Sequence, residues 1–132
     1  MRFVLILHLS ILLATDANAP LQRTRDREVD IHHIKIDVSV DIETESVYGY
    51  VVHTLSPLNS SLNSFSLDAD DMLVKRVRMG NDDLEFIYSN SKLNIEFSKP
   101  LSWSDTIKVR IDYYSKPRKG TFFVKPDKTY PE

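Results

Sequence analysis

The sequence contains no cysteine. This absence excludes disulfide bonds, thiolate metal sites and a cysteine nucleophile together. Positive charge is not in excess either, because 17 lysines and arginines stand against 19 acidic residues, for a formal net charge of -2. A chain without a strongly positive field attracts phosphate groups poorly, so nucleic acid is not expected among its partners.

Long hydrophobic runs are also missing. The nearest approach is residues 3–14, well short of the roughly 20 residues that a membrane-spanning helix needs. This run follows Met1-Arg2 and precedes Ala17-Asn18-Ala19, and small residues in that pattern are what signal peptidase accepts. We therefore predict a signal peptide over residues 1–19, cleavage after Ala19, no stable membrane span in the mature chain, and export as a secreted or periplasmic protein. An N-terminal core helix is the less favoured alternative.

Compact catalytic motifs are absent as well. The sequence has no H-E-x-x-H, no G-x-S-x-G, no P-loop and no G-x-G-x-x-G, which are the patterns that mark zinc peptidases, serine hydrolases and nucleotide-binding proteins. We therefore assign no catalytic, cofactor-binding or metal-binding residue, and we expect no cofactor in this chain.

Two groups of possible metal ligands have simpler explanations. His32 and His33 are adjacent, and neighbours on a strand point to opposite faces, so they cannot close on one ion. The acidic runs lack the glycine and the terminal glutamate of an EF-hand loop, and solvated turns explain them better. These runs consist of Asp68, Asp70 and Asp71, and of Asn81, Asp82 and Asp83.

The clearest positive signal is an alternation of period two. From residue 32 to 42 the even positions are apolar after His32, and the odd positions are polar. Such alternation predicts a strand with one face on a core and the other in water. We expect Ile34, Ile36, Val38 and Val40 to be buried.

Similar patterns continue along the chain and predict an all-β fold. We expect further strands at residues 47–55, 65–67, 73–79, 84–88, 92–97 and 107–113. Turns are expected at residues 43–46 and 89–91 and at Lys99-Pro100, with a loop over 56–66. In the strand at 73–79 we place Leu73, Lys75, Val77 and Met79 on one side and Val74 on the other. The length of 132 residues suits one domain, an antiparallel β-sandwich over 29–132 after a flexible lead-in over 20–28.

Aromatic residues gather towards the C-terminus. They could form a platform for sugars or bases, although packing in the sandwich is the favoured explanation. The residues are Trp103, Tyr113, Tyr114, Phe122, Phe123 and Tyr130.

The order of several short motifs resembles the N-terminal β-domain of the aminopeptidase N-like zinc metallopeptidases (gluzincins), a group that includes leukotriene hydrolase. Residues 29–38 look like the family's first strand, and Gly49 looks like the glycine of its second. Residues 65–69 and 73–77 resemble a Leu-Asp segment and the strand after it. Residues 93–97 and Pro100-Leu101 resemble the next strand and its exit. The most specific match is residues 111–117 and 120–127 with Tyr130-Pro131, although Thr121 stands where the family usually has leucine.

This resemblance implies a saddle-like N-terminal domain that is incomplete and ends before the catalytic domain. In intact members a later domain supplies H-E-x-x-H and a distant glutamate as zinc ligands. The β-domain's own contribution to the amine site lies beyond the Tyr-Pro segment, so Glu132 is not that residue. We therefore expect a non-catalytic scaffold or interaction domain, whose partner is a separately encoded catalytic metallopeptidase domain or the chain itself. The alternatives are a free-standing secreted module that binds protein or carbohydrate, and one subunit of an enzyme.

Overall fold

The structure is a computed structural model that describes residues 26–118 and 120–125. The predicted signal peptide, most of the predicted lead-in, Tyr130 and Glu132 lie outside these residues. Within the described part of the chain, no helix is long and apolar enough to cross a membrane.

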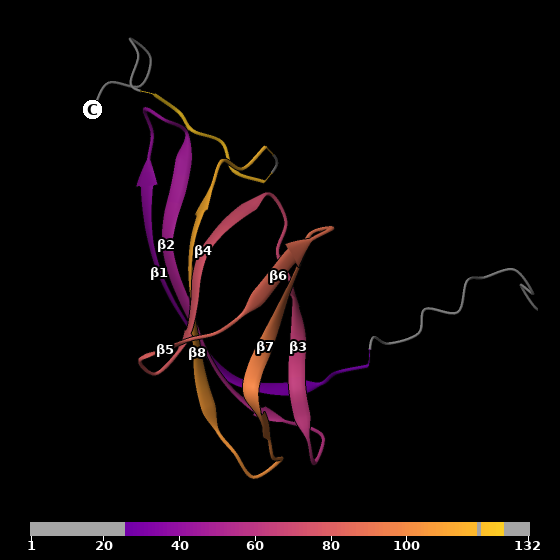
Figure 1. Ribbon diagram of the computed structural model, residues 1–132. Coiled ribbons are helices and arrows are strands. Elements are labelled where there is room, and N and C mark those ends of the chain that lie inside the picture. The colour runs from indigo at the N-terminus through magenta and orange to yellow at the C-terminus, as the bar shows by residue number, and fades with distance from the viewer. Residues whose placement is uncertain (1–25, 119, 126–132) are drawn as a thin grey trace, which may run out of the picture.

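The described residues form eight strands in two antiparallel sheets, which confirms the predicted all-β class. The large sheet has the order β1-β2-β8-β4-β5 and the small sheet the order β3-β7-β6, and Figure 1 shows the small sheet on one side of the large one. The strands are β1 (Val29–Asp41), β2 (Ser46–Pro57), β3 (Leu62–Asp68), β4 (Met72–Met79), β5 (Asp82–Asp83), β6 (Phe86–Ser89), β7 (Lys92–Leu101) and β8 (Ile107–Ser115).

The hydrophobic core lies between the two sheets. Alternate residues of facing strands fill it, as the pleat of a sheet requires. Phe65 of β3 and Phe97 of β7 stack with their ring centroids 5.7 Å apart. The buried apolar residues are Leu55, Leu62, Phe65, Ala69, Val74, Val77, Leu84, Leu93, Ile95, Phe97, Val109 and Ile111.

Two tight turns follow directly from local sequence. After β1, the Asp41 carboxylate accepts hydrogen bonds from the backbone N–H groups of Glu43 and Thr44 at 3.0 and 3.1 Å, which closes the hairpin to β2. Between β6 and β7, Asn90 and Ser91 have φ angles of 52° and 58°. Two consecutive left-handed residues favour a type I′ hairpin, in which asparagine is common. The turns predicted at residues 43–46 and 89–91 are therefore confirmed.

Gly49 allows β1 to approach β2 closely. Its φ is +154°, and a Cβ atom built there would lie 2.1 Å from the carbonyl oxygen of Asp37 on β1. Any side chain at this position would collide with the β1 backbone, so only glycine fits the β1–β2 pairing as it stands.

The predicted faces of β4 are wrong because the strand contains a β-bulge. Val74 pairs with Tyr113 and Arg76 with the next β8 residue, Asp112, so Lys75 is one extra residue. The extra residue shifts the alternation by one position. As a result Val74 and Val77 are both buried, whereas Leu73 is 59% exposed on the outer face.

Several predicted boundaries also need correction. The predicted loop over 56–66 shrinks to four residues between β2 and β3. Of the predicted strand over 84–88, only residues 86–88 lie in a strand, β6 of the small sheet, and residues 84 and 85 connect β5 of the large sheet to it. The chain changes sheet between Leu84, whose N–H bonds to Val77, and Glu85, whose carbonyl accepts from Glu96. The expected turn at Lys99-Pro100 lies inside β7. Proline is tolerated there because the regular β3 pairing breaks off in this part of β7.

The expected burial of β1 is also wrong. Ile34, Ile36, Val38 and Val40 are 47%, 65%, 47% and 58% exposed. They do share the inner face of the large sheet, because they pair with inward positions of β2. The small sheet, with three strands, packs on core residues of β2, β4 and β8, such as Leu55, Val77 and Val109. This stretch of β1 lies at the far edge of the large sheet, away from the small one (Figure 1).

Only the beginning of β1 reaches the small sheet. Glu28, just before β1, accepts a hydrogen bond from Leu58 N–H through its carbonyl and one from Ser66 N–H through its carboxylate. Val29 packs against the core. A bulge at His32 then separates this anchored part from the exposed remainder of the strand.

Candidate functional site

The exposed apolar stretch of β1 is the first candidate for a functional surface. We call Ile34, Ile36, Val38 and Val40 the open face. Contiguous apolar surface of this kind on a soluble protein commonly marks a site of association.

An open cavity of about 310 Å³ continues the open face between the sheets. Ile34 and Ile36 form one wall, and Leu67 and Ala69, at the end of β3, form another. The lining is apolar apart from His53, Asp68 and Tyr113. The cavity exists because the small sheet stops short of β1.

His53 is the titratable group that points inward from β2, as the alternation of that strand predicts. Its Nδ1 atom is buried and has no hydrogen-bond partner. Burial lowers the pKa of the imidazole, because the charged form would lose solvation. His53 is therefore neutral at neutral pH, and its environment is that of a core residue.

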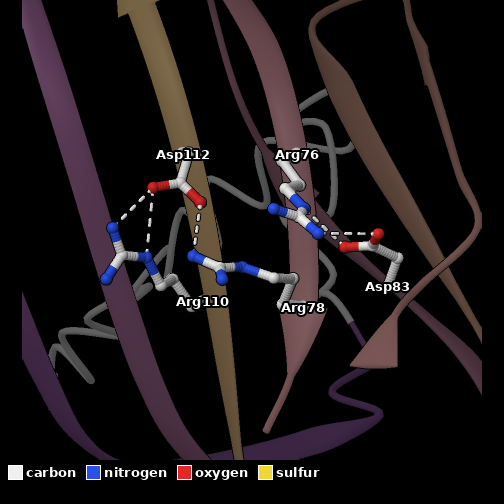
Figure 2. Close-up of polar contacts among 5 residues, drawn as sticks. All are labelled: Arg76, Arg78, Asp83, Arg110 and Asp112. Carbon is white, nitrogen blue, oxygen red and sulfur yellow. Dashed lines mark hydrogen bonds and ion pairs between the residues drawn. The ribbon is translucent and has the colours of Figure 1, made fainter. Parts of the chain in front are cut away.

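The outer face of the large sheet carries a charged network, shown in Figure 2. Asp112 of β8 lies between two guanidinium groups, and it accepts from Arg110 at 2.7 Å and from Arg78 of β4 at 3.4 Å. Asp83 of β5 faces Arg76 and accepts two hydrogen bonds from it, at 2.6 and 2.9 Å. These pairs join β8, β4 and β5 through their side chains as well as their backbones.

The same face continues towards β1 through an aromatic ring. The Arg110 guanidinium lies 3.6 Å from the ring centroid of Tyr50, and Lys35 Nζ lies 5.9 Å from the same centroid. Both distances fit cation–π contacts. These contacts extend the polar network of the outer face from β8 through β2 to β1.

This network stabilises the sheet, and neither of its carboxylates is available as a general acid or base. Hydrogen bonds from Arg110 lower the pKa of Asp112, and hydrogen bonds from Arg76 lower the pKa of Asp83. Both carboxylates remain ionised at neutral pH and bound to their partners. Sequence reasoning did not find this network, although the polar positions of β8, Lys108, Arg110 and Asp112, alternate with its apolar ones.

His32 and His33 do not form a joint site. His32 is the extra residue of the β1 bulge, and its Nε2 lies 2.9 Å from Ser56 Oγ. Its Nδ1 lies 3.8 Å from an Asp30 oxygen. Both histidines are exposed.

The acidic runs engage separate partners. Asp70 accepts from Ser91 at 2.6 Å, and Asp71 accepts from Arg118 Nε at 3.0 Å. Asp83 is held by Arg76, as described above. Among residues 26–118 and 120–125, no three histidine, aspartate or glutamate side chains converge in a way that could hold a metal ion.

The aromatic residues that lie within the described part of the chain do not gather into one platform. Tyr113 lines the cavity, whereas Tyr114 points to the outer face, with Lys75 Nζ 5.5 Å from its ring centroid. Trp103 is exposed in the loop before β8, and Tyr114 lies near the other end of that strand. Phe122 is exposed beyond the last strand.

The two packed antiparallel sheets, with the strand orders given above, define the fold class of the domain. The described residues have the fold of the N-terminal β-domain of M1 zinc metallopeptidases, and the resemblance inferred from the sequence motifs is confirmed at the level of the fold.

Two solved structures illustrate the likeness. A variant of the M1 zinc metallopeptidase of Deinococcus radiodurans, bound to a Tyr-Ser-Ala substrate, matches with a TM-score of 0.61 and 18% identity, over 76% of this chain and 24% of that one. Native leukotriene A4 hydrolase of Saccharomyces cerevisiae matches with a TM-score of 0.58 and 19% identity, over 71% of this chain and 16% of that one. No protein-family model and no curated protein sequence matches the chain. The chain spans about a fifth of the length of the solved structures that it resembles.

Proposed function

We propose that this chain serves as the N-terminal β-domain of an M1-type metallopeptidase and acts as a non-catalytic scaffold or interaction domain. The fold match to about a fifth of the M1 structures carries this proposal. The intact family removes N-terminal residues from peptides with a zinc ion, and in this proposal the zinc and the catalytic residues belong to a different domain. The chain itself needs no cofactor for such a role.

The open face supports the partner that we propose. Ile34, Ile36, Val38 and Val40 are apolar and exposed, as expected of a surface that packs against another domain. The partner in this proposal is a metallopeptidase catalytic domain. The proposed location is outside the cytoplasm, because the predicted signal peptide directs export. Among residues 26–118 and 120–125, no arrangement of aromatic side chains favours the carbohydrate-binding alternative.

One experiment tests the catalytic part of the proposal. The purified chain is titrated with zinc by calorimetry and assayed on aminoacyl anilides with added zinc. We expect neither stoichiometric binding nor turnover, because a catalytic zinc needs three convergent protein ligands and an open position for water. Stoichiometric zinc binding with turnover that a chelator abolishes would overturn the non-catalytic role.

A second experiment tests the partner. We expect the coding sequence beside this gene to contain a frame with H-E-x-x-H, and its product to co-purify with this chain on co-expression. Val38→Lys should abolish co-purification, whereas Leu73→Lys, a matched change on the outer face, should not. Absence of such a frame, or equal effects of both changes, would contradict the proposed partner.

A further inference from the structure

The two edges of the large sheet differ in a way that points to a partner for one of them. At one edge, β5 has two residues, and both are aspartates. Short, charged edges resist pairing with other chains. At the other edge, β1 has 13 residues and an exposed apolar face. Beyond the bulge at His32, its outward N–H and C=O groups form a long row that pairs with no other strand of the described residues.

We propose that β1 pairs with β1 of a second copy of this chain, antiparallel, about a two-fold axis at Ile36. This inference does not rest on the proposed function. In this register Ile34 lies opposite Val38 of the second copy, so apolar residues meet on the inner face. In this register, even-numbered residues lie opposite even-numbered ones and odd-numbered residues opposite odd-numbered ones. The residues whose N–H and C=O groups point away from β2 therefore face one another across the two copies and can form hydrogen bonds.

Charge favours this register over its two neighbours of the same parity. On the outer face, Lys35 of each copy lies opposite Asp37 of the other, so the symmetric pairing contains two opposite-charge pairs. Both positions are exposed on β1. A register centred on Lys35 would place two lysines opposite each other, and one centred on Asp37 would place two aspartates opposite each other. Like charges directly opposite each other are destabilising. A register centred on Val38 would pair Lys35 with Asp41, but it would overlap fewer residues of β1. Registers that pair even-numbered with odd-numbered residues would place Ile36 opposite a polar residue.

The absence of cysteine from the sequence allows a direct test by cross-linking. In the Ile36→Cys variant, the two thiols lie at the symmetry axis, where the Cα separation across an antiparallel pair is about 4.5–5.5 Å and a disulfide can form. In the matched Val38→Cys variant, the same residues of the two copies are four positions apart along the strand, roughly 13 Å. We expect Ile36→Cys to form the disulfide-linked dimer at least tenfold faster under mild oxidation.

A charge-reversal series tests the same pairing without cysteine. Sedimentation velocity of the wild-type chain should show a dimer at micromolar concentration. Lys35→Asp alone should weaken association about tenfold, and so should Asp37→Lys alone, because each creates two like-charge pairs. The double variant should restore association, because the opposite-charge pairs form again with their signs exchanged. All variants differ from the wild-type chain only within β1, so differences in their association report on this strand. Circular dichroism confirms that each variant folds.

Every result decides the question. A monomer at all concentrations, equal cross-linking of the two cysteine variants, or a double variant that stays as weak as the single ones would overturn the proposal. The chain alone is used throughout, so these results are independent of whether it also binds a catalytic domain.

Discussion

Two isoleucines of this protein, Ile95 and Ile36, allow a matched test of where its stability lies. Ile95 of β7 is 0% exposed, whereas Ile36 of β1 is 65% exposed. Replacing a fully buried isoleucine with alanine removes buried methyl groups and leaves a cavity, at a cost of about 2–5 kcal/mol. Complete burial of such a side chain is worth about 1.5–3 kcal/mol, so the one-third of Ile36 that is covered contributes less than about 1 kcal/mol.

The assay is urea unfolding followed by far-ultraviolet circular dichroism, at a concentration where the chain is monomeric by sedimentation. With a slope of about 2 kcal/mol per molar urea, Ile95→Ala should lower the midpoint by about 1–2.5 M, and Ile36→Ala should lower it by a small fraction of that. If Ile95→Ala does not fold, Ile95→Val supplies a milder change of about 0.5–1.5 kcal/mol. Equal losses at the two positions would refute the placement of the core. The same reasoning predicts that Ile36→Asp still folds.

Two further substitutions test individual features. Gly49→Ala should destabilise the fold by more than about 2 kcal/mol in thermal unfolding, because the new Cβ would collide with the Asp37 carbonyl. Gly80→Ala, at a turn where nothing lies within 4 Å of the new Cβ, should cost only about 1–2 kcal/mol. Similar losses for the two variants would argue against the close approach of β1 and β2. Burial lowers the pKa of His53 in the folded state, so the unfolded state binds more protons below about pH 6.5, and this residue lowers stability as the pH falls through that value. His53→Leu should therefore lose part of the decline in unfolding free energy between about pH 7 and 5, and an unchanged pH profile would show that His53 is not desolvated.

Much of the fold could be predicted from alternation alone. The β1–β2 hairpin, the type I′ turn at Asn90 and Ser91, and the inward face of β8 follow from local pattern. Alternation could not reveal the bulge at Lys75, because one extra residue in a strand changes its phase without changing its composition. It also could not locate the change of sheet at Leu84, since both halves of that segment have strand character.

The exposure of β1 has a different cause. An apolar face has the same sequence pattern whether the cover comes from the small sheet, from another domain or from a second chain. The pattern therefore identifies which face of β1 is apolar, and the extent of the small sheet determines whether it is covered. The charged network around Asp112 was missed for a related reason, since its members come from three strands and meet only when the sheet forms.

The β-bulges have a consequence for how this chain is compared with distant relatives. Lys75 is one residue too many in β4, so deleting it would restore regular alternation and keep Val74 and Val77 on the inside. A deletion elsewhere in the same strand would move the side chains of the following residues to the opposite face of the sheet and expose part of the core. His32 has the same property in β1. Insertions and deletions within these strands should therefore be tolerated at His32 and Lys75 above other positions, and gaps in an alignment with relatives of less than 20% identity belong at these two sites.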